Sequence, residues 1–184
     1  MEYDYFQLRL GRERTAQKAL ADRLHATSDV VAVFAPLLGF ASNEALVLAR
    51  AGVELGVPAE TVDRLTPTLR PTQDIRPEPG GIYVHNWFTI DGEAVDEFVR
   101  LSGEAWPDFE RRFETKIYGL FLAAESEAER ADGARRLLLM TRYRDLGEWQ
   151  VSRDPTSDAM QVFLRRRELT RASLARACIV MPRG

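Results

Sequence analysis

The stretch "GGIYVHNWFTI", residues 80–90, reads as one β-strand with two very different faces. Side chains alternate across a strand, so Tyr83, His85 and Trp87 point to one side and form an aromatic and polar face. Residues of the opposite parity form a mostly aliphatic face: Ile82, Val84, Asn86, Phe88 and Ile90. We therefore expect the aliphatic face to pack on a helix and the aromatic face to line a cavity.

The opening segment "YDYFQLRL", residues 3–10, alternates in the same way. Alignment of the two strands places four further side chains on the inward face with His85: Tyr3, Tyr5, Gln7 and Arg9. The opposite parity, with Asn86 inward and His85 under the helix, stays open from the sequence alone.

The order of elements occurs twice along the chain. The first half reads as strand, helix, two strands and a short closing strand: 3–10, 13–26, 30–40, 43–51 and 63–71. The second half repeats this order and adds a helix before its closing strand: 81–90, 93–113, 116–124, 135–145, 157–175 and 175–184. A stretch rich in proline and glycine, residues 69–81, separates the halves. We predict a first repeat over 1–72, a linker over 73–81 and a second repeat over 82–184.

Two further segments carry charge without a motif. The acidic, small-residue-rich stretch 124–134 is expected to be a mobile loop between two strands. The basic run 165–176 has helical spacing, and Leu164, Leu169 and Leu174 would face the protein. We expect that run to be the solvated face of a helix.

Three segments resemble the NIPSNAP family of the dimeric α+β barrel superfamily. In the first half the resemblance is carried by "AVFAPLLGFASNEALVLAR", residues 32–50, and in the second by "YGLFLAA" and "TRYRDLGEWQVSR", residues 118–124 and 141–153. The Pro-Gly pair that usually follows the first strand of that family is absent. The resemblance implies ferredoxin-like β-α-β-β units whose sheets carry helices on one face and build a barrel with the other. Two tandem units could then form the pseudo-twofold barrel within one chain, as a monomer with an internal pseudo-dimer or as a homodimer.

Composition limits the class of protein. The chain has 184 residues, 45% of them hydrophobic, and a formal net charge of −3, which is typical of a globular domain rather than of a surface for nucleic acid or anionic membranes. No apolar run approaches the roughly 20 residues of a membrane span, and the N-terminus lacks the pattern of a signal peptide. Cys178 is the single cysteine, so neither an intramolecular disulfide nor a multi-cysteine metal site is expected. We predict a cytoplasmic protein.

The candidate site lies on the inward face of the two opening strands. His85 is the candidate acid or base, because an unperturbed imidazole titrates near neutral pH. Aromatic walls for a small apolar or aromatic ligand would come from Tyr3, Tyr5, Tyr83 and Trp87. Gln7 and Arg9 could orient a carbonyl or a carboxylate. The alternative for His85 is a core histidine that is hydrogen-bonded to a neighbouring strand.

Three functions follow from this candidate site. The chain lacks the nucleotide-binding, zinc-protease and hydrolase motifs, so those readings have no support. The resemblance to the barrel superfamily implies, as the first function, a cofactor-free enzyme of the oxygenase or isomerase type with His85 as acid or base. The superfamily also implies a haem protein with His85 as axial ligand. The third possibility is a non-catalytic ligand carrier or scaffold. No cofactor or metal is expected in the first and third cases.

Overall fold

The computed structural model describes residues 1–39, 41 and 43–182. Within these residues the chain forms eight strands: β1 (Tyr3–Arg9), β2 (Val30–Leu38), β3 (Glu44–Arg50), β4 (Thr61–Pro67), β5 (Ile82–Asp91), β6 (Thr115–Ala123), β7 (Ala134–Tyr143) and β8 (Thr170–Val180). Five α-helices accompany them: α1 (Ala16–Leu24), α2 (Val95–Arg112), α3 (Glu127–Asp132), α4 (Leu146–Val151) and α5 (Asp158–Glu168). A short 3₁₀ turn, Gly92–Ala94, precedes α2. Phe40, Arg183 and Gly184, which end two of the predicted strands, lie outside the described residues.

The strands close into one antiparallel barrel in the order β1-β3-β2-β8-β5-β7-β6-β4. The first half contributes β4-β1-β3-β2 and the second half contributes β8-β5-β7-β6, so both halves have the same internal connections. Their sheets join where β2 pairs with β8 and where β4 pairs with β6. The predicted fold, an α+β barrel of two ferredoxin-like units, is confirmed. A duplication at the level of the sequence and the exact boundaries of the units stay predictions.

The alternation of side chains in β5 separates two cores, as expected. Tyr83 belongs to the aromatic cluster inside the barrel, together with Tyr3 and Tyr5 of β1, while Phe88 and Ile90 pack outside it. His85 points into the barrel beside Phe34, as predicted. Asn86 points to the helix side of the sheet, so the alternative with Asn86 inward is wrong.

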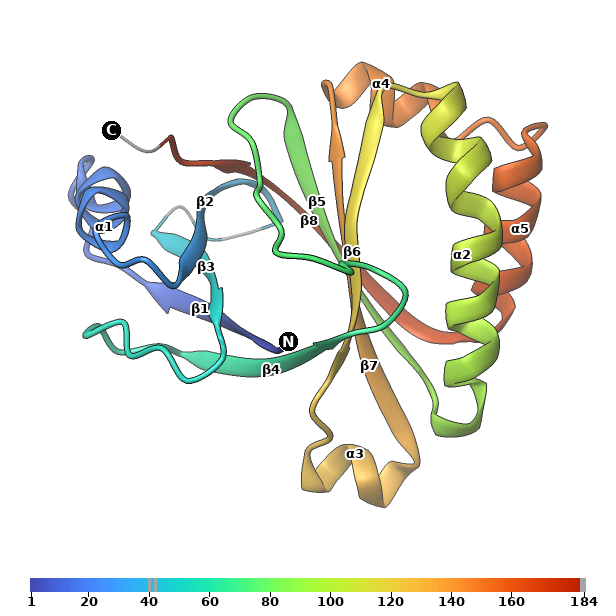
Figure 1. The fold of residues 1–184 in the computed structure, drawn as a ribbon, viewed down its shortest axis with the longest axis horizontal. Helices are drawn as coiled ribbons and strands as arrows, with labels where there is room; N and C mark the ends of the chain where they lie inside the picture. Colours follow the sequence, from blue (N-terminus) through green and yellow to red (C-terminus); the bar gives the residue numbers. More distant parts are fainter. Residues whose placement is uncertain (40, 42, 183–184) are drawn as a thin grey trace.

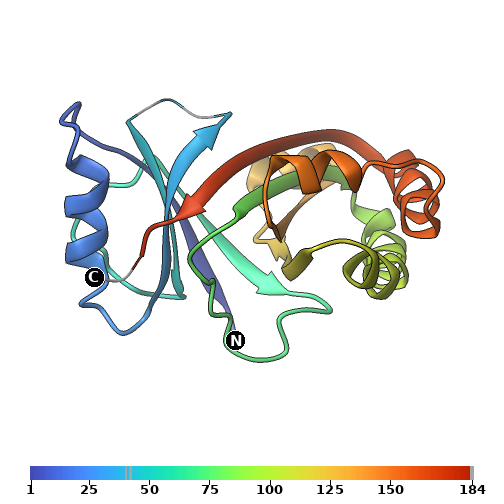
Figure 2. The same ribbon diagram turned by 90° about the horizontal axis from the view of Figure 1, so that it is seen from above.

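Helices cover the outer face of each half-barrel. In Figures 1 and 2, α1 lies against the first sheet at one end of the molecule, and α2 and α5 lie together against the second sheet at the other end. Under α2, Phe98, Leu101 and Phe109 are buried, whereas Val95 is only partly buried. In α1, Leu20, Ala21 and Leu24 are buried against the sheet, whereas Ala19 is exposed.

The acidic segment 124–134 was expected to be an irregular loop, but it contains α3. Ser126 accepts a hydrogen bond from the Glu129 backbone N–H, and the Glu129 carboxylate accepts one from the Ser126 backbone N–H. This reciprocal capping box starts the helix, and Gly133 ends it in the left-handed conformation at φ +64°. The composition of this segment predicts a loop, although its capping residues favour a short helix.

The prediction of a helix over 157–175 is wrong in its second half. The helix α5 ends at Glu168, and β8 begins at Thr170 and pairs with both β5 and β2. The barrel can close only if a strand fills this gap, so long-range pairing overrides the local helical spacing. Leu164 and Leu174, expected to face the protein, are exposed instead.

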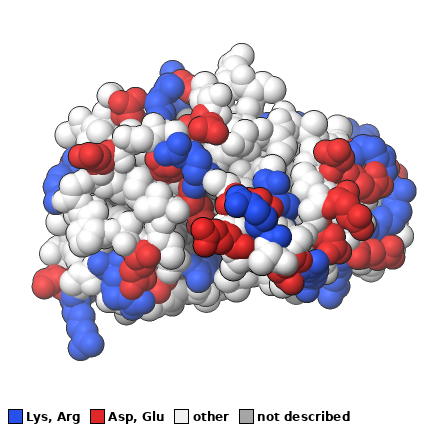
Figure 3. Space-filling model, turned by 90° about the horizontal axis from the view of Figure 1, so that it is seen from below, with Lys and Arg blue, Asp and Glu red and all other residues white. Residues whose placement is uncertain are grey.

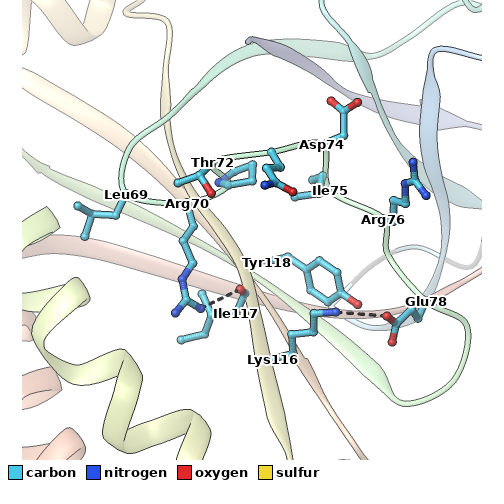
Figure 4. A pocket seen from close by; sticks show the side chains of 12 residues that line it. Leu69, Arg70, Thr72, Asp74, Ile75, Arg76, Glu78, Lys116, Ile117 and Tyr118 are labelled. Atoms are coloured by element: carbon cyan, nitrogen blue, oxygen red, sulfur yellow. Dashed lines mark hydrogen bonds and ion pairs between the residues drawn. The ribbon is translucent and has the colours of Figure 1, made fainter.

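The linker closes one end of the barrel. Ile75 inserts into the interior aromatic cluster, and the Tyr83 hydroxyl donates to the Glu78 carbonyl at 2.7 Å. A cavity of about 880 Å³ lies between this linker and β6, and Figure 4 shows Lys116 and Glu78 paired at its edge. Gly81, the residue before β5, has φ +72°, and a Cβ there would stand 2.4 Å from the Tyr143 carbonyl oxygen. Only glycine fits this junction between linker and strand.

The surface mixes charges of both signs. On the face shown in Figure 3, acidic and basic side chains are interspersed. In the described part of the chain, no helix is both long and apolar enough to cross a membrane.

Candidate functional site

His85 lies in the centre of the barrel rather than on the wall of a cavity. Its side chain is fully buried, and its ring contacts Phe34 edge-on with the centroids 4.6 Å apart. The Nδ1 atom lies 2.7 Å from the Tyr5 hydroxyl, and Nε2 lies 3.6 Å from the Cys178 sulfur. Side chains from both halves thus fill the middle of the barrel around the imidazole.

The contacts of His85 form one directed chain of hydrogen bonds. The Tyr5 hydroxyl donates to Nδ1 of His85, which leaves the proton on Nε2 to be donated to the Cys178 sulfur. The Trp87 ring packs edge-on against the Tyr5 ring, with the centroids 5.8 Å apart. The Cys178 thiol donates to the Tyr83 carbonyl at 3.5 Å. The reverse direction would leave the buried Tyr5 hydroxyl hydrogen with no acceptor among the described residues.

Burial keeps the titratable side chains that are hydrogen-bonded around His85 neutral. Loss of solvation lowers the pKa of His85 to about 3. Burial also raises the pKa of the Tyr5 hydroxyl and that of the Cys178 thiol. Near neutral pH the centre of the barrel therefore holds no charge, and His85 cannot serve there as an imidazolium acid.

An open cavity lies at the end of the barrel opposite the linker, and we call it the mouth cavity. Its volume is about 430 Å³, and its lining comes from five strands: Tyr5, Gln7, Thr61, Asp63, Trp87, Thr89, Arg136, Ala172, Ser173, Leu174 and Arg176. Tyr5 belongs to this lining, and its hydroxyl also hydrogen-bonds His85. The aromatic wall of the cavity is thus connected to the centre of the barrel.

Charged side chains surround that aromatic wall. The Arg136 guanidinium lies 5.1 Å from the centre of the Trp87 ring, and it donates to Asp63 at 2.7 Å and to Glu129. Burial opposes the charged form of Arg136, but the hydrogen bonds to these two carboxylates raise its pKa overall. Across the cavity, Arg176 donates to the Gln7 side-chain oxygen at 3.1 Å. The mouth therefore presents an apolar surface with hydrogen-bonding groups at its rim.

The structure brings together only some of the predicted site residues. Tyr5, Gln7 and Trp87 meet at the mouth cavity. Tyr3 and Tyr83 lie toward the linker end, where Tyr3 packs edge-on against Phe121 and Tyr83 bonds to the linker. Arg9 is half exposed and pairs with the carboxylates of Glu60 and Glu44 on the surface.

Sequence reasoning missed the polar residues of the mouth. Three of them point inward from their strands: Asp63 from β4, Arg136 from β7 and Arg176 from β8. The alternation of side chains along a strand could have predicted this direction for Asp63 and Arg136. Arg176 was missed because its strand was in part predicted to be a helix.

The surroundings of His85 do not fit a haem. An axial ligand needs one free ring nitrogen beside space for a porphyrin, whereas both nitrogens of His85 make contacts in a packed interior. Among residues 1–39, 41 and 43–182 no group of three or more histidine, cysteine or acidic side chains is placed to hold a metal ion. We therefore assign neither a haem nor a metal ion to His85.

Comparison with known proteins supports the fold. No protein-family model matches the sequence, and no curated protein matches it. Among solved structures, an anthrone oxidase-like protein has a TM-score of 0.65 at 11% identity, covering 98% of this chain and 92% of its own. A candidate monooxygenase from Fusobacterium nucleatum has a TM-score of 0.63 at 8% identity, with 98% and 92% covered. A heme-degrading enzyme from Listeria monocytogenes has a TM-score of 0.57 at 9% identity, with 96% and 98% covered.

Proposed function

We propose that this protein is a small-molecule-binding barrel whose ligand enters the mouth cavity and lies against Trp87 and Tyr5. The observation that carries the proposal is the combination of an aromatic wall with a rim of hydrogen-bonding groups in one concave site, which is typical of small-ligand sites. A ligand with an apolar or aromatic body and one or two polar groups matches this lining. The indole ring is the main contact surface, and the Arg136 guanidinium lies over this ring, where it makes a cation–π contact.

The central chain of hydrogen bonds supports binding more than catalysis. A general base must lie within hydrogen-bond reach of the proton that it removes. His85 has no exposed surface, so a proton from a ligand would have to pass through the Tyr5 hydroxyl. In this proposal His85 holds Tyr5, and Tyr5 presents a fixed wall to the ligand.

An oxygenase acting without a cofactor is the second candidate. The names of the structurally similar proteins, an anthrone oxidase-like protein and a candidate monooxygenase, favour this candidate although the low identities support only the fold. Oxygen uptake with anthrone separates the two candidates. Uptake above the buffer rate that is lost in Tyr5→Phe would favour an oxygenase, and no uptake would favour a binding protein.

The narrower assignment to a NIPSNAP-like protein is part of the proposal and depends on the sequence motifs alone. The duplication of one unit and a monomeric state with an internal pseudo-dimer belong to the proposal as well. The equivalent connections of the two half-barrels support them.

Substitution of Trp87 tests the binding site. We expect Trp87→Leu to weaken binding of 1-naphthol, a neutral aromatic probe, by at least about tenfold, equivalent to about 1.4 kcal/mol. The variant removes the indole ring from the cavity wall and retains an apolar side chain. The affinity is measured by isothermal titration calorimetry, and the thermal melt of each protein shows whether it is folded.

Leu146→Ala is the control, because Leu146 is an exposed apolar side chain on α4 that lines neither the mouth cavity nor the cavity between the second sheet and its helices. It should bind 1-naphthol as the unmodified protein does. Equal affinity of folded Trp87→Leu and the unmodified protein would contradict the proposed site, as would an equal loss in Leu146→Ala.

A further inference from the structure

A second cavity lies outside the barrel, between the outer face of the second sheet and its helices. This helix-side cavity has a volume of about 140 Å³. Its walls are largely apolar and aromatic: Val84, Phe109, Ile117, Leu139, Trp149, Phe163 and Ala175. Asn86, Arg153 and Arg166 add polar groups to the lining. Because Asn86 and Trp87 point to opposite faces of β5, this cavity is separate from the mouth cavity.

Arg166 is a buried cation without an acidic partner. Its residue is 7% exposed, and its guanidinium lies 4.7 to 4.9 Å from the ring centres of three phenylalanines: Phe88, Phe98 and Phe163. Its Nη1 donates to the Ser102 hydroxyl at 3.0 Å. In the described part of the chain, no carboxylate forms an ion pair with Arg166. A buried charge of this kind is unfavourable unless a counter-charge reaches it.

Arg153 adds a second positive charge at the rim of the same cavity. It is exposed and donates to the Tyr143 hydroxyl at 3.2 Å, and its guanidinium lies over the rings of Trp149 and Phe109. Burial lowers the pKa of Arg166 to about 10; the interaction with Tyr143 opposes this shift, and the positive charge of Arg153 adds to it. The two guanidiniums therefore repel each other across a site that lacks negative charge.

Asn86 provides a third unmatched group. Its side-chain oxygen is buried and has no hydrogen-bond partner among the residues that the structure describes. The oxygen and nitrogen of such an amide are interchangeable in assignment, so Asn86 can offer either an acceptor or a donor to a ligand. The unpartnered buried oxygen of this half-buried side chain points to a missing polar group in the cavity.

We propose that the helix-side cavity binds a small carboxylate with an apolar or aromatic body, held by Arg166 and Arg153. A planar guanidinium matches a carboxylate by paired hydrogen bonds. The aromatic side walls suit a flat ring next to that carboxylate. The volume corresponds to about four or five water molecules, which limits the ligand to about the size of benzoate. This site is independent of the proposed function, since the two cavities lie on opposite faces of the sheet.

Benzoate is the probe, benzamide is its uncharged counterpart and inorganic phosphate is the competing anion. We expect calorimetry to detect benzoate binding, with benzamide at least about tenfold weaker. Arg166→Met keeps the length of the side chain and removes the charge, and it should weaken benzoate by at least about tenfold. Arg167→Met on the same helix is the control, because Arg167 is exposed and outside the cavity. It should leave the affinity unchanged.

Arg153→Met at the exposed rim is the second variant, and it tests the site even if Arg166→Met does not fold. It should also weaken benzoate. The proposal is overturned if benzoate does not bind at about 10 mM, if benzamide or phosphate binds as tightly as benzoate, or if a folded arginine variant keeps full affinity. Loss of benzoate binding in Trp87→Leu with full binding in Arg166→Met would place the anion in the mouth cavity and would also overturn it.

Discussion

We expect Phe98→Ala to lower the free energy of unfolding by about 3–5 kcal/mol, as is usual for large truncations in a core. Phe98 is fully buried at the centre of the cluster between α2 and the second sheet, and its ring lies 5.0 Å from that of Phe88. It also covers the Arg166 guanidinium at 4.9 Å. Its removal therefore leaves a void and takes away one aromatic partner of a buried charge.

Urea denaturation of the two proteins measures this loss. Arg112→Ala at the exposed end of the same helix is the control and should change stability by less than about 0.5 kcal/mol. A loss below about 1 kcal/mol for Phe98→Ala would contradict the packing of α2 described above.

His85 should make the folded protein sensitive to acid. Its pKa is about 3 in the folded state because of burial, whereas an unfolded chain would have an ordinary value near 6.5. Between these values the unfolded state binds more protons, so stability rises with pH and is lost as the pH falls below about 6.5. Each pH unit in this window changes the free energy by up to about 1.4 kcal/mol.

His85→Gln removes this titration while keeping polar groups in the core. From about pH 7 to about pH 5, the unmodified protein should lose about 2 kcal/mol more stability than the variant loses. Urea melts of both proteins across this range measure the difference, and the carboxylates that titrate in both cancel. Parallel curves would show that His85 is solvated and free to protonate in the folded state.

The alternation of the two opening strands predicted much of the barrel. In β5 the faces differ so strongly that Trp87 and Phe88 had to point to different environments, and they do. Parity, however, does not say whether an inward side chain meets a cavity or a packed core. His85 meets a packed core because Tyr5 and Phe34 from the first half fill the space beside it.

The remaining errors come from interactions that are distant in sequence. The spacing of Arg165 to Arg176 is helical in part, but pairing with β5 and β2 makes its second half a strand. Arg166 was expected to be solvated, yet the aromatic side chains of α2 and β5 bury it. The charge and the spacing of residues 165–176 do not show which strands or aromatic side chains will lie against them in the fold.

The most direct test of the central claim is a crystal structure of the protein with bound 1-naphthol. The claim is that the barrel binds a small molecule at its mouth while His85 stays sealed in the core. We predict density for the probe against the Trp87 ring and Tyr5, with the hydrogen bond from Tyr5 to His85 intact. Density in the centre of the barrel in contact with His85, or a mouth cavity that stays empty while the probe binds elsewhere, would contradict the claim.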